Sequence, residues 1–436
     1  MRDSPIIYSL FPRLIGPMPR WLAHTARAKE MGFTWIHLNP VHYPGFSGSL
    51  YAVKDFYELN PLFVSEGCQD AMGELRDTLA AMHDQGLRVM MDLVVNHTAK
   101  DSPLVKEHPT WFRRDDDGYV VSPSAIDPAD SRKVTVWGDL AEIDNTNSPQ
   151  RQALWAHWTA LVQYYLDLGF DGFRCDAAYK VPARLWQLLI SAGRRHDAEV
   201  LFAAETLGCR LAEVRGLRAA GFDYLFNSSK WWNFDQPWAL DQHAEFGEIA
   251  PSISFPETHD TRRLFDDTEG LLQVQKQRYL LAAAFASGLL MPVGYEFGFK
   301  KKLDVVETMP DDWETDGPDL SAFIRGVNSL FGRLPAFGAE GRWEVLTDLD
   351  SATTLLCKRA KGSPPLVLAI NKDWLSPQVV TLPALTSVFG HIPPTLYRLF
   401  DETTARSGDI VTETAPSGAR LTLAPAEIAI LSHEGS

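Results

Sequence analysis

Short apolar segments alternate with helical patterns along most of the chain. The segments that read as strands lie at 6–10, 35–39, 88–95, 172–176, 200–204, 224–227, 253–255 and 290–294. Helical periods lie between them, at 21–31, 69–85, 153–168, 182–192, 271–287 and 320–331. Alternation of strands and helices predicts a parallel sheet, and eight strands in one run favour a closed barrel over an open, doubly wound sheet.

The pattern predicts two domains. A (β/α)8 barrel of the TIM type is expected over 1–337, and 98–140 is expected to be a short, irregular insert because it is polar and has no helical period. Short strand-like runs without helices follow in 338–436, which predicts an antiparallel β-sandwich. These runs lie at 343–346, 353–358, 366–370, 379–382, 397–400 and 428–431.

Polar side chains stand at the ends of several predicted strands. Because the carboxyl ends of parallel strands meet at one mouth of a barrel, these side chains are expected to converge there. They are Asn96, His97, Arg174, Asp176, Glu205, His259 and Asp260. Any one of them could be an ordinary solvated or capping residue, so their shared position is what points to an active site.

Arg174 and Asp176 lie two residues apart on an otherwise apolar strand, so they face the same side. One interpretation is an ion pair at a surface edge. The other is a carboxylate that a neighbouring guanidinium keeps ionised, as a nucleophilic aspartate requires. The second is favoured because unpaired charges on a buried strand would be costly.

Three carboxylates at converging strand ends suit glycoside hydrolysis. Asp176 would attack the anomeric carbon, and Glu205 would protonate the leaving oxygen and then deprotonate the acceptor. Asp260 would stabilise the positive charge that develops on the sugar. Crowding of like charges should raise the pKa of at least one carboxyl group, as a general acid needs.

The composition excludes several classes of partner. A formal net charge of −15 disfavours binding to nucleic acid or to anionic membranes. The most apolar run, 280–293, is too short to span a membrane, and no signal peptide is evident at the start. Four scattered cysteines without metal-ligand spacing predict reduced thiols in a cytoplasmic protein. Oligomeric state stays open.

Several ordered motifs resemble the α-amylase family of glycoside hydrolases. Residues 92–97, 172–178, 204–206 and 257–261 are similar to its four signature motifs, and read D-L-V-V-N-H, G-F-R-C-D-A-A, A-E-T and E-T-H-D-T. Residues 32–40 and 288–298 resemble its signatures at the second and eighth strands, and 139–147 resembles the segment before its third helix. The resemblance covers nearly the whole chain.

The resemblance implies a retaining enzyme that acts on α-glucans, maltooligosaccharides or small α-glucosides, with hydrolysis favoured. It implies Asp176 as nucleophile, Glu205 as acid/base and Asp260 as stabiliser of the sugar. It also implies a set of substrate-binding residues, which are Tyr51, Asp92, Asn96, His97, Arg174, Lys180 and His259. A carbohydrate substrate is the partner that it predicts.

The chain departs from the family after the nucleophile. A Lys-His pair often follows there, and in calcium-binding members that histidine often supplies a carbonyl ligand. Here the run after Asp176 is Ala-Ala-Tyr-Lys. Together with the short insert, this departure predicts no calcium requirement, no other metal and no cofactor.

Three alternatives stay open. Residues 8–13, 107–112, 180–182 and 294–296 resemble maltosyltransferases that use maltose 1-phosphate, so the chain could be an α-glucan transglycosidase or a maltosyltransferase with an activated maltosyl donor. A non-catalytic sugar-binding barrel is a second alternative, although such proteins typically lose the carboxylates. A metal-dependent barrel isomerase is the third, and sensitivity to EDTA would distinguish it.

Overall fold

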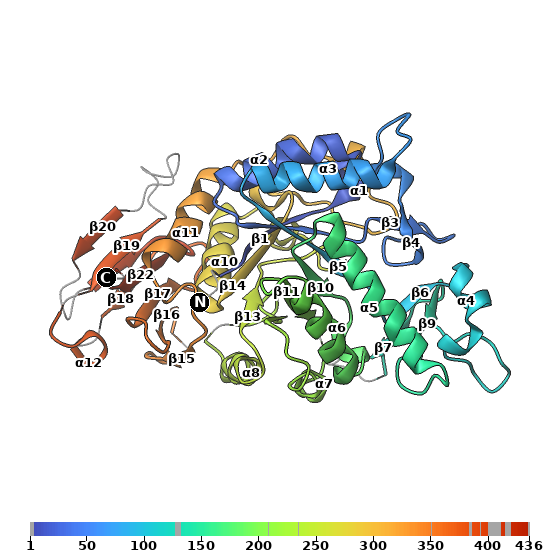
Figure 1. Ribbon diagram of the computed structural model, residues 1–436. Coiled ribbons are helices and arrows are strands. Elements are labelled where there is room, and N and C mark those ends of the chain that lie inside the picture. The colour runs from blue at the N-terminus through green and yellow to red at the C-terminus, as the bar shows by residue number, and fades with distance from the viewer. Residues whose placement is uncertain are drawn as a thin grey trace.

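The computed structural model describes residues 4–126, 132–207, 209–233, 235–349, 351–382, 386–392, 394–399, 411–414 and 420–434. Within them lies the predicted barrel, closed and parallel, with strand order β1-β14-β13-β12-β11-β10-β5-β2 (Figure 1). Its strands are β1 (Ile6–Leu10), β2 (Trp35–Leu38), β5 (Arg88–Leu93), β10 (Gly172–Cys175), β11 (Leu201–Glu205), β12 (Tyr224–Phe226), β13 (Ser252–Ser254) and β14 (Gly288–Pro292). The (β/α)8 fold class is therefore confirmed, and the predicted strand bounds differ by one or two residues at most ends.

The predicted helices surround the barrel, as Figure 1 shows. They are α2 (Trp21–Glu30), α3 (Ala71–Asp84), α5 (Arg151–Leu168), α6 (Ala183–His196), α10 (Leu272–Phe285) and α11 (Ser321–Arg333). Gly169 ends α5 with a left-handed backbone at φ 115°, a conformation that glycine adopts without strain. The sequence pattern missed α7 (Leu211–Gly216) and α8 (Pro237–Gly247), because α7 is short and α8 has a weak apolar period.

The insert after β5 is more ordered than predicted. It contains α4 (Pro103–Glu107), and β6 (His97–Ala99) pairs with β9 (Leu140–Glu142). A second hairpin joins β7 (Ser124–Ile126) to β8 (Val134–Val136). The expectation of an irregular segment was therefore wrong, because three-residue strands that pair across 40 positions leave no period in the sequence. The hairpin of β3 (His42–Pro44) and β4 (Val53–Leu59) was also missed; β3 has only three residues, and the pairing is irregular.

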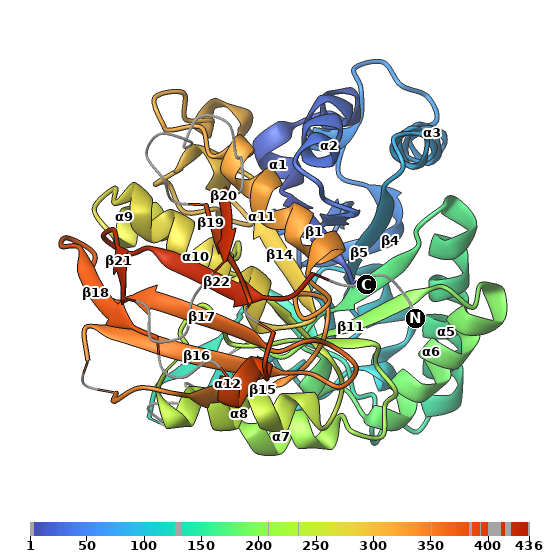
Figure 2. The same cartoon turned by 90° about the vertical axis from the view of Figure 1, so that its left-hand side faces the viewer.

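After α11 the chain forms antiparallel sheets, which lie on the left in Figure 1 and face the viewer in Figure 2. The larger sheet has the order β15-β16-β17-β22-β19-β20, and a smaller one pairs β18 with β21. Their bounds are β15 (Arg342–Val345), β16 (Thr353–Arg359), β17 (Leu366–Asn371), β18 (Gln378–Thr381), β19 (Thr395–Arg398), β20 (Val411–Thr414), β21 (Arg420–Leu423) and β22 (Ile428–Ser432). A short helix, α12 (Thr386–Phe389), corrects the expectation that this part has none. Phe400 of the predicted 397–400 strand lies outside the described residues.

The larger sheet is buried on both faces. Leu356, Leu368 and Ile430 pack into the core that the barrel helices share, whereas the alternate residues Cys357 and Val367 pack toward the smaller sheet. Such alternation is what a strand in a two-layer arrangement requires. The domain limits at 337 and 338 stay a prediction.

A buried lysine joins this sheet to the barrel. Lys358 Nζ donates to the carbonyl oxygens of Ala284 and Ala336, each at 2.8 Å. Burial lowers the pKa of Lys358 to about 7. These two hydrogen bonds satisfy the ammonium group, which would otherwise be costly to bury.

Two layers of side chains fill the barrel. The lower layer is apolar and consists of Ile7, Trp35, Met90, Leu201, Ala203, Tyr224, Phe226, Ile253, Phe255 and Leu290. On β1, β2 and β5 the residues two positions further along are polar, and they point the same way because side chains in a strand alternate with a period of two. This upper layer contains Ser9, His37, Asp92, Arg174 and Glu205. The barrel therefore changes from apolar to polar at the mouth that its strand ends form.

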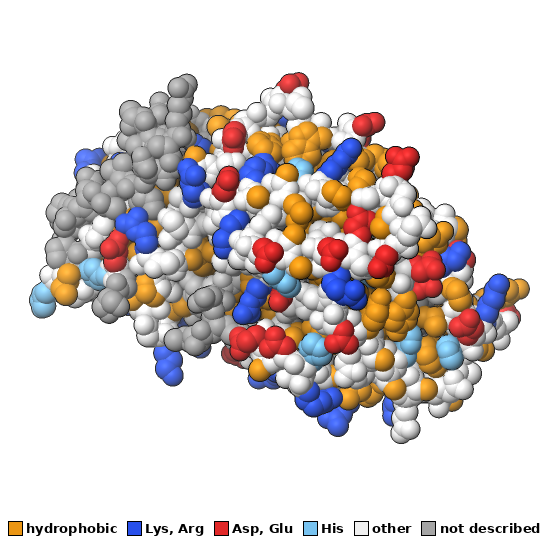
Figure 3. All heavy atoms as spheres, turned by 45° about the horizontal axis from the view of Figure 1, so that its top comes forward, with side chains coloured by type: hydrophobic (Ala, Val, Ile, Leu, Met, Phe, Trp, Pro, Cys, Tyr) orange, Lys and Arg blue, Asp and Glu red, His pale blue; other side chains and the backbone are white. Residues whose placement is uncertain are grey.

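On the face that Figure 3 shows, the described charged side chains form no basic area of the kind that nucleic acid or an anionic membrane would need. Figure 3 shows acidic and basic side chains interspersed over one face, without a continuous basic area among the described atoms. None of the helices in the described ranges combines the length and the apolar character that a membrane span needs.

Candidate active site

The predicted carboxylates meet at the mouth of the barrel. Asp176 follows β10 directly, and Glu205 ends β11, the neighbouring strand, in which Ala204 pairs with Cys175. The Asp176 N–H still donates to the Leu93 carbonyl of β5 at 3.1 Å, so the strand geometry extends up to Asp176. Asp260 lies in the turn after β13, with its side chain half exposed, whereas the side chain of Asp176 is largely buried.

Glu205 is held by backbone donors. Its two carboxylate oxygens accept hydrogen bonds from the N–H groups of Ala177 and Leu207, both at 3.0 Å. Burial raises the pKa of Glu205 to about 7, although Arg174 opposes the shift; the charge of Asp260 adds to it. A carboxyl group with this pKa can carry a proton near neutral pH, as a general acid must.

Arg174 lies closer to Asp92 than to Asp176. Its Nη1 makes a very short hydrogen bond to Asp92 Oδ1 and lies 3.8 Å from Asp176 Oδ1. Burial raises the pKa of Asp176 well above its usual range, with Arg174 acting against this. Arg174 therefore lies near both aspartates and is bound more closely to Asp92. Burial would also raise the pKa of Asp92, but Arg174 brings it well below its usual range, so Asp92 is the permanently charged member.

The Tyr51 hydroxyl contacts three polar side chains at the mouth of the barrel. Its hydroxyl donates to Asp92 Oδ2 at 2.7 Å and lies 2.9 Å from His259 Nε2. Asn39 Nδ2 donates to the same hydroxyl at 3.0 Å. The Tyr51 and His259 rings also stack, with their centroids 5.6 Å apart. Side chains from three other segments are thus fixed relative to Asp92.

The other predicted binding residues, Asn96, His97 and Lys180, lie outside the hydrogen bonds that the Tyr51 hydroxyl makes. His97 lies buried beside Asn96, whose Nδ2 is 3.3 Å from His97 Nδ1, and burial lowers the pKa of His97 to about 4. Lys180 Nζ instead donates to the Ser124 carbonyl of β7 at 3.1 Å and lies over the Tyr179 ring. Lys180 therefore links the insert to the loop after the β10 strand.

Three residues that the sequence argument missed join this network. Asn39 contacts Tyr51, His37 lies 3.2 Å from Asp92 Oδ2, and Ser9 contacts His37. His37 and Asn39 could have been predicted as site residues, because 35–39 was predicted as a buried strand although it contains a histidine and an asparagine. A polar side chain on such a strand needs a partner.

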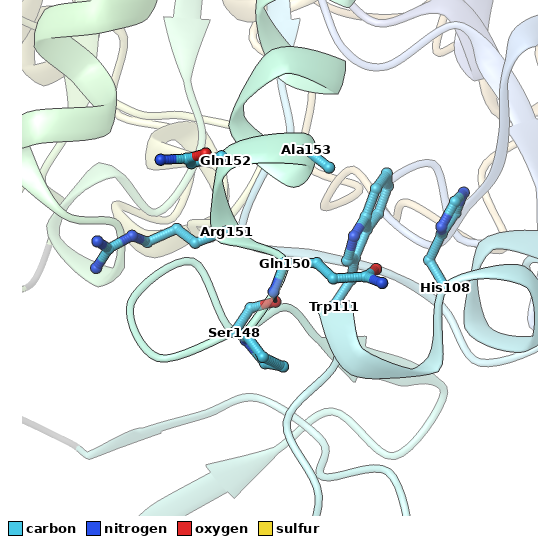
Figure 4. A pocket seen from close by; sticks show the side chains of 8 residues that line it. His108, Trp111, Ser148, Gln150, Arg151, Gln152 and Ala153 are labelled. Carbon is cyan, nitrogen blue, oxygen red and sulfur yellow. Dashed lines mark hydrogen bonds between the residues drawn. The ribbon is translucent and has the colours of Figure 1, made fainter.

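The structure contains two hollows, of which one is lined by residues of this network and the other is not. A small cavity inside the mouth is lined by Ser9, His37, Arg174, Glu205, Leu207, Phe226, Phe255, Thr258, His259 and Leu290. A more open hollow at the start of α5 has a stacked His108–Trp111 pair on one wall (Figure 4). None of the predicted site residues lines the open hollow, whereas Arg174, Glu205 and His259 line the smaller cavity.

The described residues contain no group of three or more His, Cys, Asp or Glu side chains arranged to hold a metal ion. Calcium independence stays a prediction. Treatment with EDTA is expected to leave both the activity and the melting temperature unchanged. A large fall in either one, restored by calcium, would refute this expectation.

Comparison with known proteins supports the family resemblance. A profile of the glycogen debranching enzyme glucanotransferase domain matches residues 2–115. An alpha-1,4-glucan:maltose-1-phosphate maltosyltransferase of Burkholderia pseudomallei is 27% identical over 394 residues, which are 86% of this chain and 34% of the relative. The corresponding enzyme of Myxococcus xanthus is 25% identical over 416 residues, covering 87% of this chain and 59% of the relative. The chain thus spans only part of the length of these relatives.

Solved structures match in fold. An α-amylase from Lactobacillus plantarum superposes with a TM-score of 0.75 at 21% identity, and 98% of each chain is covered. An α-amylase from Geobacillus thermoleovorans, determined with acarbose, has a TM-score of 0.76 at 18% identity and 99% coverage of each chain. At these identities the likeness concerns the fold, including the barrel and the sheets that follow it.

Proposed function

We propose that this chain, whose barrel and similarities support an α-amylase-family protein with likeness to maltosyltransferases, is a retaining enzyme that acts on α-glucosidic bonds. One observation carries the proposal. Asp176 and Glu205 stand at the ends of neighbouring parallel strands, and Glu205 has a pKa of about 7. A sugar between the two could meet a nucleophile on one face and a proton donor beside the bond that breaks.

The first step would form a glycosyl ester. An Asp176 carboxylate oxygen attacks the anomeric carbon while the bond to the leaving oxygen breaks, and Glu205 transfers its proton to that oxygen. Arg174, 3.8 Å from Asp176, favours the charged form of the nucleophile. Asp260, half exposed at the mouth, would stabilise the positive charge on the sugar in the transition state.

The second step would release the sugar. Glu205, now ionised, takes a proton from the acceptor hydroxyl, whose oxygen attacks the anomeric carbon and displaces Asp176. With water as acceptor the reaction is hydrolysis, which the sequence argument favours. With a sugar hydroxyl it is transfer.

Transfer from an activated maltosyl donor is the second candidate, and a specific observation favours it. The relatives described above are named as maltosyltransferases that use maltose 1-phosphate. In that reaction the leaving group would be phosphate, and the acceptor would be the non-reducing end of an α-glucan.

Product analysis separates these candidates. The purified protein would be incubated with maltose, maltoheptaose, sucrose, trehalose or maltose 1-phosphate, each with and without a glucan acceptor. Hydrolysis predicts free sugars whatever acceptor is added. Transfer predicts longer glucans and, from maltose 1-phosphate, release of inorganic phosphate that depends on the acceptor. Binding of a glucan without any turnover would favour a non-catalytic barrel and contradict the proposal.

The acid/base role predicts a dependence on pH and on the leaving group. Only protonated Glu205 can donate, and with a pKa of about 7 its protonated fraction falls as the pH rises. For donors with poor leaving groups, kcat/KM should therefore decline roughly tenfold per pH unit above that value. Glu205→Gln should abolish this reaction yet retain formation of the ester from α-maltosyl fluoride, which needs no proton. Equal losses on both donors would argue against Glu205 as the acid.

A further inference from the structure

The upper polar layer of the barrel contains two residues that the proposed reaction does not use. Ser9 belongs to β1 and His37 to β2, which are neighbours paired in register at these two positions. Both side chains are buried, and both line the small cavity that Arg174, Glu205 and His259 also line. β2 pairs in turn with β5, the strand that carries Asp92.

Ser9 contacts His37, and His37 contacts Asp92. Ser9 Oγ lies 2.9 Å from His37 Nδ1, and His37 Nε2 lies 3.2 Å from Asp92 Oδ2. Nε2 is buried and makes no hydrogen bond of regular geometry among the described residues, so the Asp92 carboxylate is the acceptor that it faces. Since a carboxylate only accepts, Nε2 is the ring nitrogen that would donate to Asp92, and Nδ1 is the one that faces the Ser9 hydroxyl.

Asp92 is the point at which these contacts join the reacting groups. One of its oxygens accepts from Arg174, and the other accepts from Tyr51. Arg174 is in turn the cation nearest to Asp176, and Tyr51 contacts His259 beside Asp260. The His37 ring, 3.2 Å from Asp92 Oδ2, closes the remaining side of this buried carboxylate, so its loss would let Asp92 rotate and move Arg174 and Tyr51 with it.

We propose that Ser9 and His37 form a buried relay that holds Asp92 and thereby positions Arg174 and Tyr51 for the reaction at Asp176. Both are positioning residues, because neither touches the reacting atoms. This inference rests on the proposed function, for which it adds two residues that the sequence analysis did not assign to the site.

A matched pair of substitutions tests the relay. Gln at position 37 can place an amide where Nε2 stands, toward Asp92, whereas Asn can place one only where Nδ1 stands, toward Ser9. With α-maltosyl fluoride as the probe, His37→Asn should lower kcat about 10–100-fold, the effect of losing a hydrogen bond to a charged group. His37→Gln should stay within about fivefold of the wild type. KM should change less than kcat in both variants.

The controls separate positioning from packing. His42 is another buried histidine, in β3, where Nε2 contacts the Tyr165 hydroxyl at 3.1 Å, away from the carboxylates. His42→Asn should lower the melting temperature and leave kcat unchanged. Equal kcat for His37→Asn and His37→Gln would overturn the relay, provided that Asp176→Asn is inactive. Full activity of Asp176→Asn would instead overturn the proposed function itself.

Discussion

Asp176→Asn is expected to lower kcat by on the order of 10³-fold or more while the protein stays folded. An amide at this position cannot form the glycosyl ester, so the two-step route is closed. The substitution replaces a largely buried carboxyl group with an amide of the same size, so the fold is expected to be retained. Turnover of α-maltosyl fluoride and circular dichroism would be measured together.

A second variant controls for the loss of a carboxyl group next to β10. Asp171 lies before β10, where its carboxylate accepts from the Val89 N–H at 2.7 Å and contacts His83. It is at the opposite end of that strand from the mouth. Asp171→Asn should keep its activity. Near-normal activity of Asp176→Asn would refute the assignment of the nucleophile.

Arg263→Met is expected to destabilise the protein by about 3–5 kcal/mol, because it leaves a buried charge without its partner. Arg263 Nη1 lies 2.8 Å from Glu257 Oε1, and both side chains are only 1% exposed. Arg263 also donates to the carbonyl oxygens of Val293 and Lys301. These contacts anchor the loop that carries Asp260. Denaturant unfolding measures the change directly.

The adjacent arginine is the matched control. Arg262 is 69% exposed and pairs with Asp266 at the surface, so Arg262→Met should cost no more than about 1 kcal/mol. Adding Glu257→Gln to Arg263→Met should recover part of the stability, since the unpaired charge is then gone. Equal effects of the two arginine substitutions would contradict the buried ion pair.

Much of the fold follows from local patterns. Each barrel strand is an apolar run bounded by a turn signal, and glycines such as Gly169 mark where helices end. The hairpins of the insert could not be predicted in this way. β6 and β9 are three residues each, and their pairing depends on hydrogen bonds between distant positions. Short strands of this kind leave neither a length nor a period to detect.

The candidate site shows the same division. The carboxylates could be placed at one mouth because the ends of parallel strands converge there. The partner of Arg174 could not be predicted, because Asp92 lies 82 positions earlier. The two residues meet only through the register of β5 and β10, which pairs Arg174 with Asp92. A spacing of two residues predicted that Arg174 and Asp176 face the same side. It could not predict which carboxylate lies closer to the Arg174 guanidinium.

The configuration of the first product tests the retaining mechanism most directly. A nucleophilic Asp176 requires the two carboxyl groups to stand about 5–5.5 Å apart, whereas an inverting enzyme needs roughly 6.5–9.5 Å for a water between them. Neighbouring strands about 4.8 Å apart favour the shorter separation. Proton NMR of the early reaction mixture should therefore show an α-configured product, whether the acceptor is water, phosphate or a sugar. A β-configured product that appears before mutarotation would contradict the retaining mechanism and the role of Asp176.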